Sequence, residues 1–237
     1  MKLAGTTALV TGSNRGIGTS FATGLLRRGA KVYATARQPQ LVDITGAEVL
    51  RLDITDPDSV RAAAEIADDV DILINNAADT AGGNLVTGEM EAIRHVMESN
   101  YFGTLNVIRA FAPILARNGG GAIVNVLSAA AWLTVDGNTA YAAAKSAEWG
   151  LTNGVRLELA SQGTQVVGLM PGLIGTQTLY DFAHTAGIEF PEGVVTEPAA
   201  LVELALDGLE AGEIEIADAI GLQAKATLAG PPQAFTL

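Results

Sequence analysis

Tyr141 and Lys145 have the residue types and the spacing of an acid–base pair. They lie four residues apart in the segment AYAAAKSAEWG, which has a helical period, so both side chains project from one face of the expected helix. A free phenol holds its proton too tightly to exchange it readily at neutral pH, and a nearby ammonium favours the ionised form. The pair therefore predicts proton exchange with an alcohol or a carbonyl oxygen. The same spacing occurs by chance on many helices, so the pair is informative only together with other polar residues.

Ser128 and Asn100 add two polar groups to this predicted site. Ser128 follows the apolar run 123–127, and the carboxyl end of such a strand is where open α/β sheets bind their ligands. Its hydroxyl can donate to a carbonyl oxygen while Tyr141 protonates that oxygen. Asn100 interrupts a long helical stretch with the sequence SNYFG at 99–103, in which Asn and Gly are poor helix formers. A structural kink and a polar role beside Lys145 both explain its presence.

A glycine-rich turn, TGSNRGIG at Thr11–Gly18, directly follows the first apolar run of the chain. Glycines let the backbone approach a pyrophosphate closely, and the start of the following helix offers unpaired N–H groups and a partial positive charge. Any tight strand-to-helix connection favours glycine, but the position at the first crossover favours a dinucleotide. The sequence therefore predicts a dinucleotide site at this turn.

The end of the second expected strand indicates which dinucleotide binds. Folds that bind NAD usually carry an acidic residue there, about 20 residues past the glycines, whereas an Arg accommodates the additional phosphate of NADP. Here the strand ends in Arg37 without a carboxylate, and Arg15 lies in the turn. Because guanidinium groups bind phosphate bidentately, we predict NADP(H) as the cofactor. A lone Arg at a strand end is more often a solvated charge, so an NAD(H)-dependent alcohol or hydroxysteroid-type dehydrogenase is the alternative.

Short apolar runs rich in Val, Ile and Ala alternate with longer segments of helical period. This pattern favours a Rossmann-type α/β fold, a doubly wound parallel sheet of about seven strands with helices on both faces. The expected strands are 7–11, 31–35, 48–53, 71–75, 122–127, 165–170 and 213–217. The expected helices are 16–28, 58–67, 87–117, 139–161, 176–186 and 198–211. No linker or repeat divides the chain, so we expect one catalytic domain over residues 1–237.

The composition argues against several classes of function. The chain has 237 residues, of which 49% are hydrophobic, and its net charge of −12 disfavours nucleic acid and anionic membranes as partners. It has no cysteine, and its two histidines lie far apart in sequence, so neither a disulfide framework nor a metal site is expected. The longest apolar stretch, 119–135, is short for a membrane span and contains polar residues. We expect a cytoplasmic protein without a signal peptide.

Taken together, these residues resemble the short-chain dehydrogenase/reductase family over nearly the whole chain. The glycine turn is similar to its cofactor turn, NNA at 75–77 to its motif after the fourth strand, and Pro171-Gly172 followed by Thr176 to its nicotinamide segment. Asn100, Ser128, Tyr141 and Lys145 fall where its catalytic residues fall. The cofactor-binding residues expected from the turn, the strand ends and this resemblance are Gly12, Ser13, Asn14, Arg15, Gly16, Ile17, Gly18, Arg37, Asp53, Ile54, Asn76, Ala77, Ala78, Tyr141, Lys145, Pro171, Gly172, Ile174 and Thr176.

The resemblance implies a role for each catalytic residue. Tyr141 donates and accepts the proton, and Lys145 binds the nicotinamide ribose and favours ionisation of Tyr141. Ser128 orients the substrate oxygen, and Asn100 holds a water that links Lys145 to solvent. In the family the two long helices pair across a two-fold axis, so a homodimer or homotetramer is expected.

Two positions depart from the family pattern. Ala78 stands where the family usually has Gly, and it would crowd the cofactor if that position needed a positive φ. The end of the chain, 214–237, lacks the glycine-rich closing pattern of the fatty-acid-synthesis reductases.

The segment after Pro171-Gly172 predicts the substrate class. We expect residues 172–196, which are rich in apolar side chains, to form a lid over the site. No Lys or Arg lies between Arg156 and Lys225, so a carboxylate or phosphate would find no counter-ion there. An uncharged ketone, aldehyde or alcohol is therefore the expected partner. The expected substrate residues are Ser128, Trp132, Tyr141, Leu173 and Leu179, with Trp132 fitting a pocket wall and a plain core position about equally.

Two other functions are compatible with this fold. One is a lyase similar to the halohydrin dehalogenases, which have arginine in place of the lysine and a halide pocket in place of the cofactor turn. Lys145 and the intact glycine turn argue against this function. A non-catalytic nucleotide sensor would be expected to lose Tyr141, which is present.

Overall fold

The computed structural model describes residues 1–229, apart from the side chains of residues 185 and 186. Its centre is a seven-stranded parallel sheet with the strand order β3-β2-β1-β4-β5-β6-β7. The strands are β1 (Thr7–Val10), β2 (Lys31–Ala36), β3 (Glu48–Arg51), β4 (Ile72–Asn75), β5 (Ala122–Val126), β6 (Gln165–Met170) and β7 (Glu215–Ala217). The predicted fold class is confirmed, and every expected strand lies within two residues of its observed bounds.

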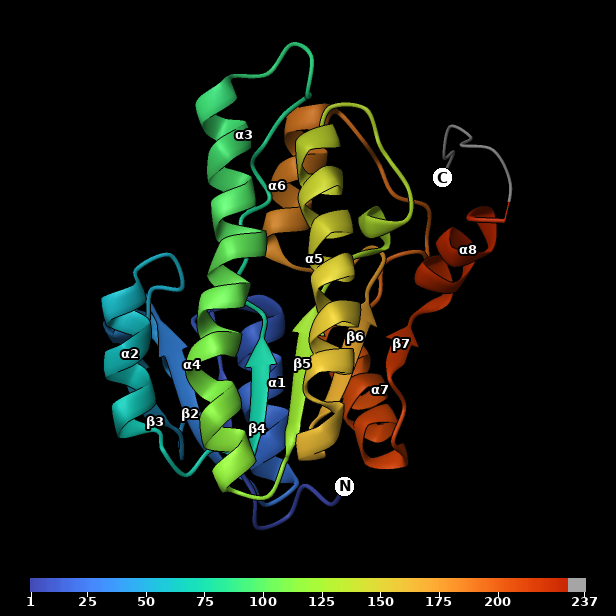
Figure 1. The fold of residues 1–237 in the computed structure, drawn as a ribbon. Helices are drawn as coiled ribbons and strands as arrows, with labels where there is room; N and C mark the ends of the chain where they lie inside the picture. Colours follow the sequence, from blue (N-terminus) through green and yellow to red (C-terminus); the bar gives the residue numbers. More distant parts are fainter. Residues whose placement is uncertain (230–237) are drawn as a thin grey trace.

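Helices cover both faces of this sheet (Figure 1). One face carries α1 (Gly16–Arg27) and α7 (Pro198–Ala211), and the other carries α2 (Pro57–Ile66), α4 (Thr104–Arg117) and α5 (Thr139–Glu158). Beyond the carboxyl ends of the strands lie α3 (Met90–Met97) and α6 (Gln177–Ala186), and α8 (Ala219–Thr227) follows β7. The loops that leave the strands at this edge are therefore enclosed by helices.

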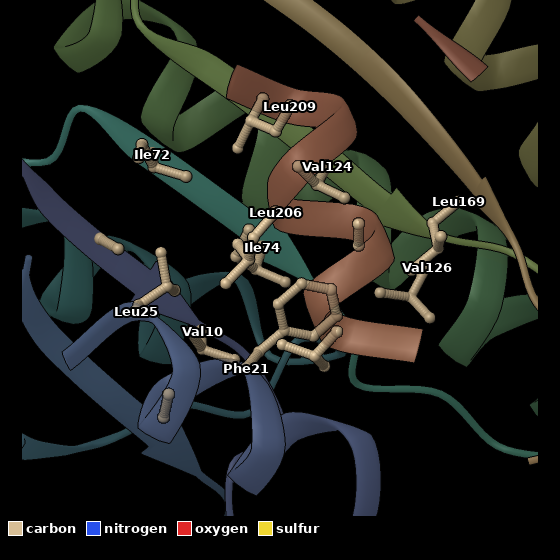
Figure 2. Packing of buried hydrophobic residues seen from close by; sticks show 14 of the residues in the cluster. Val10, Phe21, Leu25, Ile72, Ile74, Val124, Val126, Leu169, Leu206 and Leu209 are labelled. Carbon is tan, nitrogen blue, oxygen red and sulfur yellow. The ribbon is translucent and has the colours of Figure 1, made fainter. Parts of the chain in front are cut away.

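The five strands between the edge strands β3 and β7 are buried from both sides, which explains their nearly continuous apolar sequences. On one face, Phe21 of α1 and Leu206 of α7 pack together over Val10 and its neighbours on the adjacent strands (Figure 2). On the other face, Phe111 of α4 lies in a second cluster with residues of α2 and α5. The two clusters hold the sheet rigidly, so the loops at its carboxyl edge have a fixed platform.

The long helix predicted over 87–117 is divided in the structure. It begins at Met90, and a π-helical segment at Glu98–Gly103 separates α3 from α4. Within this segment the Asn100 side chain donates hydrogen bonds to the backbone oxygens of Val96 and Asp79, both at 2.8 Å. The polar residue in the helical pattern therefore marks a local widening of the helix, a feature that is frequent at functional sites.

Two helices in the second half of the chain differ from the prediction. The helix expected over 139–161 ends at Glu158 and is followed by a short 3-10 turn at Ala160–Gln162. Helix α8 was not predicted, because it is short and Gly221 and Thr227 weaken its helical pattern. The Asp218 side chain caps it by accepting a hydrogen bond from the Gly221 N–H at 2.8 Å. Of the chain end 214–237, residues 230–237 lie outside the described part.

The strand order creates a crevice at the carboxyl edge of the sheet. β1 lies next to β4, although β2 and β3 separate them in sequence, so the connections after β1 and after β4 leave towards different sides. Ligands of open α/β sheets bind at such a switch point. Within residues 1–229, no helix is long and apolar enough to cross a membrane.

Candidate active site

A cavity of about 1400 Å³ opens at the carboxyl ends of the strands. It brings together all but four of the residues predicted for the site. The predicted residues in its wall are Gly12, Asn14, Arg15, Gly16, Ile17, Arg37, Asp53, Ile54, Asn76, Ala77, Ala78, Ser128, Tyr141, Lys145, Pro171, Gly172, Leu173, Ile174, Thr176 and Leu179. Segments that are far apart in the sequence therefore form one continuous site.

The glycine turn has the backbone geometry that a pyrophosphate needs. Gly12 and Gly16 have positive φ angles of 68° and 56°, which favour glycine. A Cβ atom on Gly18 would lie 2.1 Å from the carbonyl oxygen of Gly12, so α1 starts directly against the turn. Arg15, the N-cap residue of α1, makes no side-chain capping hydrogen bond. The first N–H groups of α1 thus have no side-chain oxygen as a partner, and the cradle fits a bound phosphate.

Hydrogen bonds between the loops after β1 and β4 fix the position of this turn. The Asn76 side chain donates to the backbone oxygens of Thr11 and Gly12, at 2.9 and 3.2 Å. The Thr11 hydroxyl in turn accepts from the N–H groups of Asn76 and Ala77, at 2.9 and 3.0 Å. The NNA sequence therefore has a structural reason, because it ties the glycine turn to the neighbouring strand end.

Arg15 and Arg37 lie in the wall of the same cavity and are exposed. Within residues 1–229 neither has an ion-pair partner. Asp53 also lines the cavity, and its side chain accepts from the N–H and the hydroxyl of Thr55. Both guanidinium groups are thus available to an anionic ligand.

Ala78 fits its position without backbone strain. Among the described residues, only glycines have a positive φ. The condition under which Ala78 would crowd the cofactor, a positive φ, is therefore not met.

Ser128 and Tyr141 reach the cavity from two different elements. Ser128 follows β5 and caps a 3-10 turn at Ala129–Ala131, where its Oγ accepts a hydrogen bond from the Ala130 N–H at 3.1 Å. Accepting this bond leaves the hydroxyl proton free to be donated to a ligand. Tyr141 lies in the first turn of α5 and is half-buried. A hydrogen-bond donor and a phenol thus share one wall of the cavity.

Lys145 is held in a fixed position one turn further along α5. Its side chain is only 1% exposed, and its Nζ lies 5.8 Å from the centre of the Tyr141 ring. Nζ donates to the backbone oxygen of Val126 at 3.0 Å and to a carboxylate oxygen of Glu148 at 2.7 Å. Burial alone would lower the pKa of Lys145, but the charges of Glu148 and Tyr141 and the hydrogen bond to Glu148 together hold the pKa above its usual value. Lys145 is therefore a cation beside Tyr141.

The four predicted residues that do not line the cavity are buried behind its wall. Ser13 is fully buried and donates to the Val10 oxygen, and Gly18 packs on Gly12, so both shape the turn from behind. Trp132 is 7% exposed and packs edge-on against Trp149 in a hydrophobic cluster with α8. In this structure Trp132 thus occupies the core position that the sequence offered as the alternative to a pocket wall. Asn100 is also fully buried, and its Oδ1 has no hydrogen-bond partner within residues 1–229.

The ends of the predicted lid, 172–196, are tied together. Ile174 and Thr196 form an isolated parallel bridge, in which the Thr196 N–H donates to Leu173 at 2.8 Å and the Gly175 N–H donates to Thr196 at 2.9 Å. The segment between them contains α6, and Leu179, Phe182, Ile188 and Phe190 line the cavity. The lid segment therefore begins and ends at one place beside the cavity.

Two buried carboxylates near the site were missed in the sequence. Glu148 forms an ion pair with Lys145 on the buried face of α5. The sequence does show an acidic residue three positions after the lysine, a spacing at which the two side chains can meet on a helix, and this pattern could have indicated the pair. Asp218 accepts hydrogen bonds from the N–H groups of Gly172 and Gly221, both at 2.8 Å. It thus joins the loop after β6 to α8, and no local pattern revealed this long-range contact.

Comparisons with known proteins agree with this geometry. The family model described as short chain dehydrogenase matches residues 6–186. The oxidoreductase UcpA of Salmonella typhimurium is 33% identical over 228 residues, covering 90% of this chain and 87% of that protein. The 3-oxoacyl-acyl-carrier-protein reductase FabG of Vibrio cholerae is 34% identical over 212 residues, covering 84% of this chain and 87% of that protein. The crystal structure of a short chain dehydrogenase from Burkholderia cenocepacia in complex with NADP is 36% identical, with a TM-score of 0.87 and coverage of 97% of this chain and 95% of that one.

Proposed function

Because the chain belongs to the short-chain dehydrogenase family of oxidoreductases, we propose that it is an NADP(H)-dependent enzyme that interconverts an uncharged, largely apolar ketone or aldehyde and the corresponding alcohol. The observation that carries the proposal is that Ser128, Tyr141 and Lys145 line the same cavity as the glycine turn and as Arg15 and Arg37, which have no ion-pair partner within residues 1–229. The test is to mix the protein with NADPH and a panel of neutral ketones and to follow the absorbance of the reduced cofactor. Consumption of NADPH that depends on the ketone supports the proposal, and none with any ketone or aldehyde opposes it.

The proposed roles of the residues follow from their chemistry. Ser128 donates a hydrogen bond to the carbonyl oxygen, and Tyr141 gives that oxygen its proton, so the carbonyl becomes a hydroxyl. When bound, NADPH supplies the hydride that adds to the carbonyl carbon. Lys145 stabilises the tyrosinate that remains and uses its free N–H for a ribose hydroxyl, because two of its three donors are already bound. In the reverse direction the same groups take the proton from the alcohol.

A buried proton donor needs a route to solvent after each turnover. Asn100 presents a buried Oδ1 without a partner, while its Nδ2 is fixed by two backbone oxygens. An unsatisfied buried acceptor of this kind is a position for an ordered water. We propose that this water connects Lys145 to solvent, which is the role that the family resemblance implies for Asn100.

The cofactor preference is tested by removing the Arg37 guanidinium. Arg37→Ala should raise the dissociation constant of NADPH by roughly ten- to a hundredfold, because a charge-assisted contact contributes about 1.5–3 kcal/mol. The affinity for NADH should stay unchanged, because NADH lacks the additional phosphate. Titration of the cofactor fluorescence measures both constants. The matched control is Arg61→Ala, which removes an exposed arginine of α2 that pairs with Asp58 outside the cavity.

Two outcomes would contradict NADP(H) as the preferred cofactor. One is equal affinity of the unaltered protein for the two cofactors. The other is an equal loss of affinity for both in Arg37→Ala, since that result would place Arg37 against a group that NADH also carries.

The substrate class is tested by comparing a neutral alicyclic ketone with a keto acid of similar size. The lid presents apolar side chains, and no Lys or Arg lies between Arg156 and Lys225 to pair with a carboxylate. We expect kcat/KM to be at least about tenfold higher for the ketone, since even 1.4 kcal/mol of uncompensated charge gives that ratio. Equal or faster turnover of the keto acid would show that the lid residues only pack on the sheet.

We also propose that the enzyme acts as a symmetric dimer or tetramer. Helix α5 lies beside the helical stretch formed by α3 and α4 on one face of the molecule (Figure 1). Large apolar side chains on this face remain exposed, among them Met90, Phe102 and Leu157. A two-fold contact between such faces would cover them.

A further inference from the structure

Glu148 is a buried carboxylate for which the proposed proton transfer has no direct use. It lies on α5, is 2% exposed and does not line the cavity. One of its oxygens accepts from Lys145 Nζ at 2.7 Å, and the other accepts from the Thr104 hydroxyl at 3.1 Å. Both oxygens are thus engaged, and the carboxylate lies outside the cavity wall to which Lys145 belongs.

Lys145 has no other buried counter-ion besides Glu148 within residues 1–229. Within residues 1–229, the charges that raise the pKa of Lys145 are those of Glu148 and, when it is ionised, Tyr141. On α3, the π-helical segment and α4, which pack against this part of α5, the charged side chains are all exposed: Glu91, Arg94, His95, Glu98, Arg109 and Arg117. β5, β6 and the turn at Ala129–Ala131 carry no charged residue. A buried ammonium without a counter-ion tends to lose its proton, because burial disfavours the charged form.

From this geometry we infer that Glu148 is a positioning residue for the proposed reaction, which keeps Lys145 charged and fixes its Nζ between β5 and Tyr141. The inference rests on the proposed function for its catalytic consequence. Its physical content, a carboxylate that keeps a buried ammonium protonated, does not depend on the reaction. The side chain of Glu148 does not line the cavity and bonds Lys145 and Thr104, so we expect it to act on the reaction through Lys145.

The first test uses the protein without cofactor and measures thermal unfolding of Glu148→Gln at pH 6.5 and at pH 9.5. In the unaltered protein the pKa of Lys145 is raised by Glu148, so Lys145 keeps its proton in both states throughout this range and adds no pH dependence. In the variant the pKa of Lys145 should fall below the value of about 10.4 found in unfolded chains. The folded state then binds fewer protons than the unfolded chain, and its stability rises with pH.

We therefore expect the loss of melting temperature in Glu148→Gln at pH 9.5 to be about half of the loss at pH 6.5, or less. The matched control is Glu158→Gln, which makes the same change of charge at an exposed position of the same helix. Its melting temperature should differ little from that of the unaltered protein at either pH. A loss in Glu148→Gln that is the same at both pH values would overturn the inference.

A second variant decides the question if Glu148→Gln is too unstable to study. Adding Lys145→Met to Glu148→Gln removes the unpaired ammonium, so the double variant should melt at a higher temperature than Glu148→Gln alone at pH 6.5. A double variant that is less stable than the single one would mean that Glu148 serves packing only, and would overturn the inference.

The catalytic consequence is read from the pH profile of alcohol oxidation. Glu148→Gln should move the acid limb of kcat/KM to higher pH by about one unit or more, since a neutral Lys145 no longer favours the tyrosinate. Glu148→Asp, which restores the charge, should move the limb back towards its original position. An unmoved limb, or a limb moved to lower pH, would overturn the inference. If no alcohol is oxidised at all, the proposed function fails, and the unfolding measurements still decide whether Glu148 keeps Lys145 charged.

Discussion

Tyr141→Phe will still bind NADPH but will lose at least about a hundredfold, and up to about ten thousandfold, in turnover of a ketone. This range is the usual contribution of a positioned general acid. The variant keeps the aromatic ring in the first turn of α5 and removes only the hydroxyl, which has no hydrogen-bond partner within residues 1–229. The melting temperature should therefore stay close to that of the unaltered protein. Steady-state kinetics and cofactor titration on one preparation separate the two effects.

Tyr101→Phe provides the matched control for this experiment. It removes a phenol hydroxyl from the π-helical segment next to Asn100, at a position outside the cavity wall. Its turnover should be close to that of the unaltered enzyme. Near-native turnover of Tyr141→Phe would require another acid, and the proton-donor assignment would be wrong.

Gly18→Ala should severely disrupt the cofactor turn, because the space beside Gly18 is already filled. The added Cβ would lie 2.1 Å from the Gly12 oxygen and 2.6 Å from the Asn76 side-chain nitrogen, so the turn or α1 must move. Overpacking of this kind costs about 3 kcal/mol, which corresponds to a fall in melting temperature of roughly 6–12 °C in a protein of this size. The displaced turn should also raise the dissociation constant of NADPH by about a hundredfold.

Thr23→Ala tests whether the effect belongs to the turn or to α1 in general. Thr23 is an exposed residue of the same helix, and its hydroxyl bonds only within the helix. Because Ala is the better helix former, this variant should be as stable as the unaltered protein and should bind NADPH normally. A Gly18→Ala protein that behaves like Thr23→Ala would contradict the close approach of α1 to the turn.

The fold was predictable because strong local patterns agree with each other. Apolar runs such as 122–127 have no alternative to a strand buried on both faces, and the glycine turn marks the first crossover. The predictions failed where the local pattern is weak. Helix α8 depends on the cap from Asp218, and the widening of the helix around Asn100 depends on a contact with the backbone of Asp79. Neither contact is visible in the period of the helical segment itself.

Much of the candidate site was also predictable, because its residues lie in strong local sequence motifs. Residues in motifs with fixed spacing, such as Gly12 and Tyr141, do line one cavity. The residues behind the cavity wall were harder to predict, because their positions arise from packing. Trp132 lies near Ser128 in sequence but packs against Trp149, and Glu148 becomes meaningful only when α5 is seen to bury it beside Lys145.

The central claim, that this cavity transfers a hydride from NADPH to a carbonyl carbon, is tested most directly with a labelled cofactor. The protein is incubated with NADPH that carries deuterium at the transferable position of the nicotinamide and with a neutral ketone, and the product alcohol is analysed by mass spectrometry. The account predicts an alcohol with one deuterium on its carbinol carbon, formed in step with cofactor oxidation. An alcohol without deuterium, or cofactor oxidation without any alcohol, would contradict it.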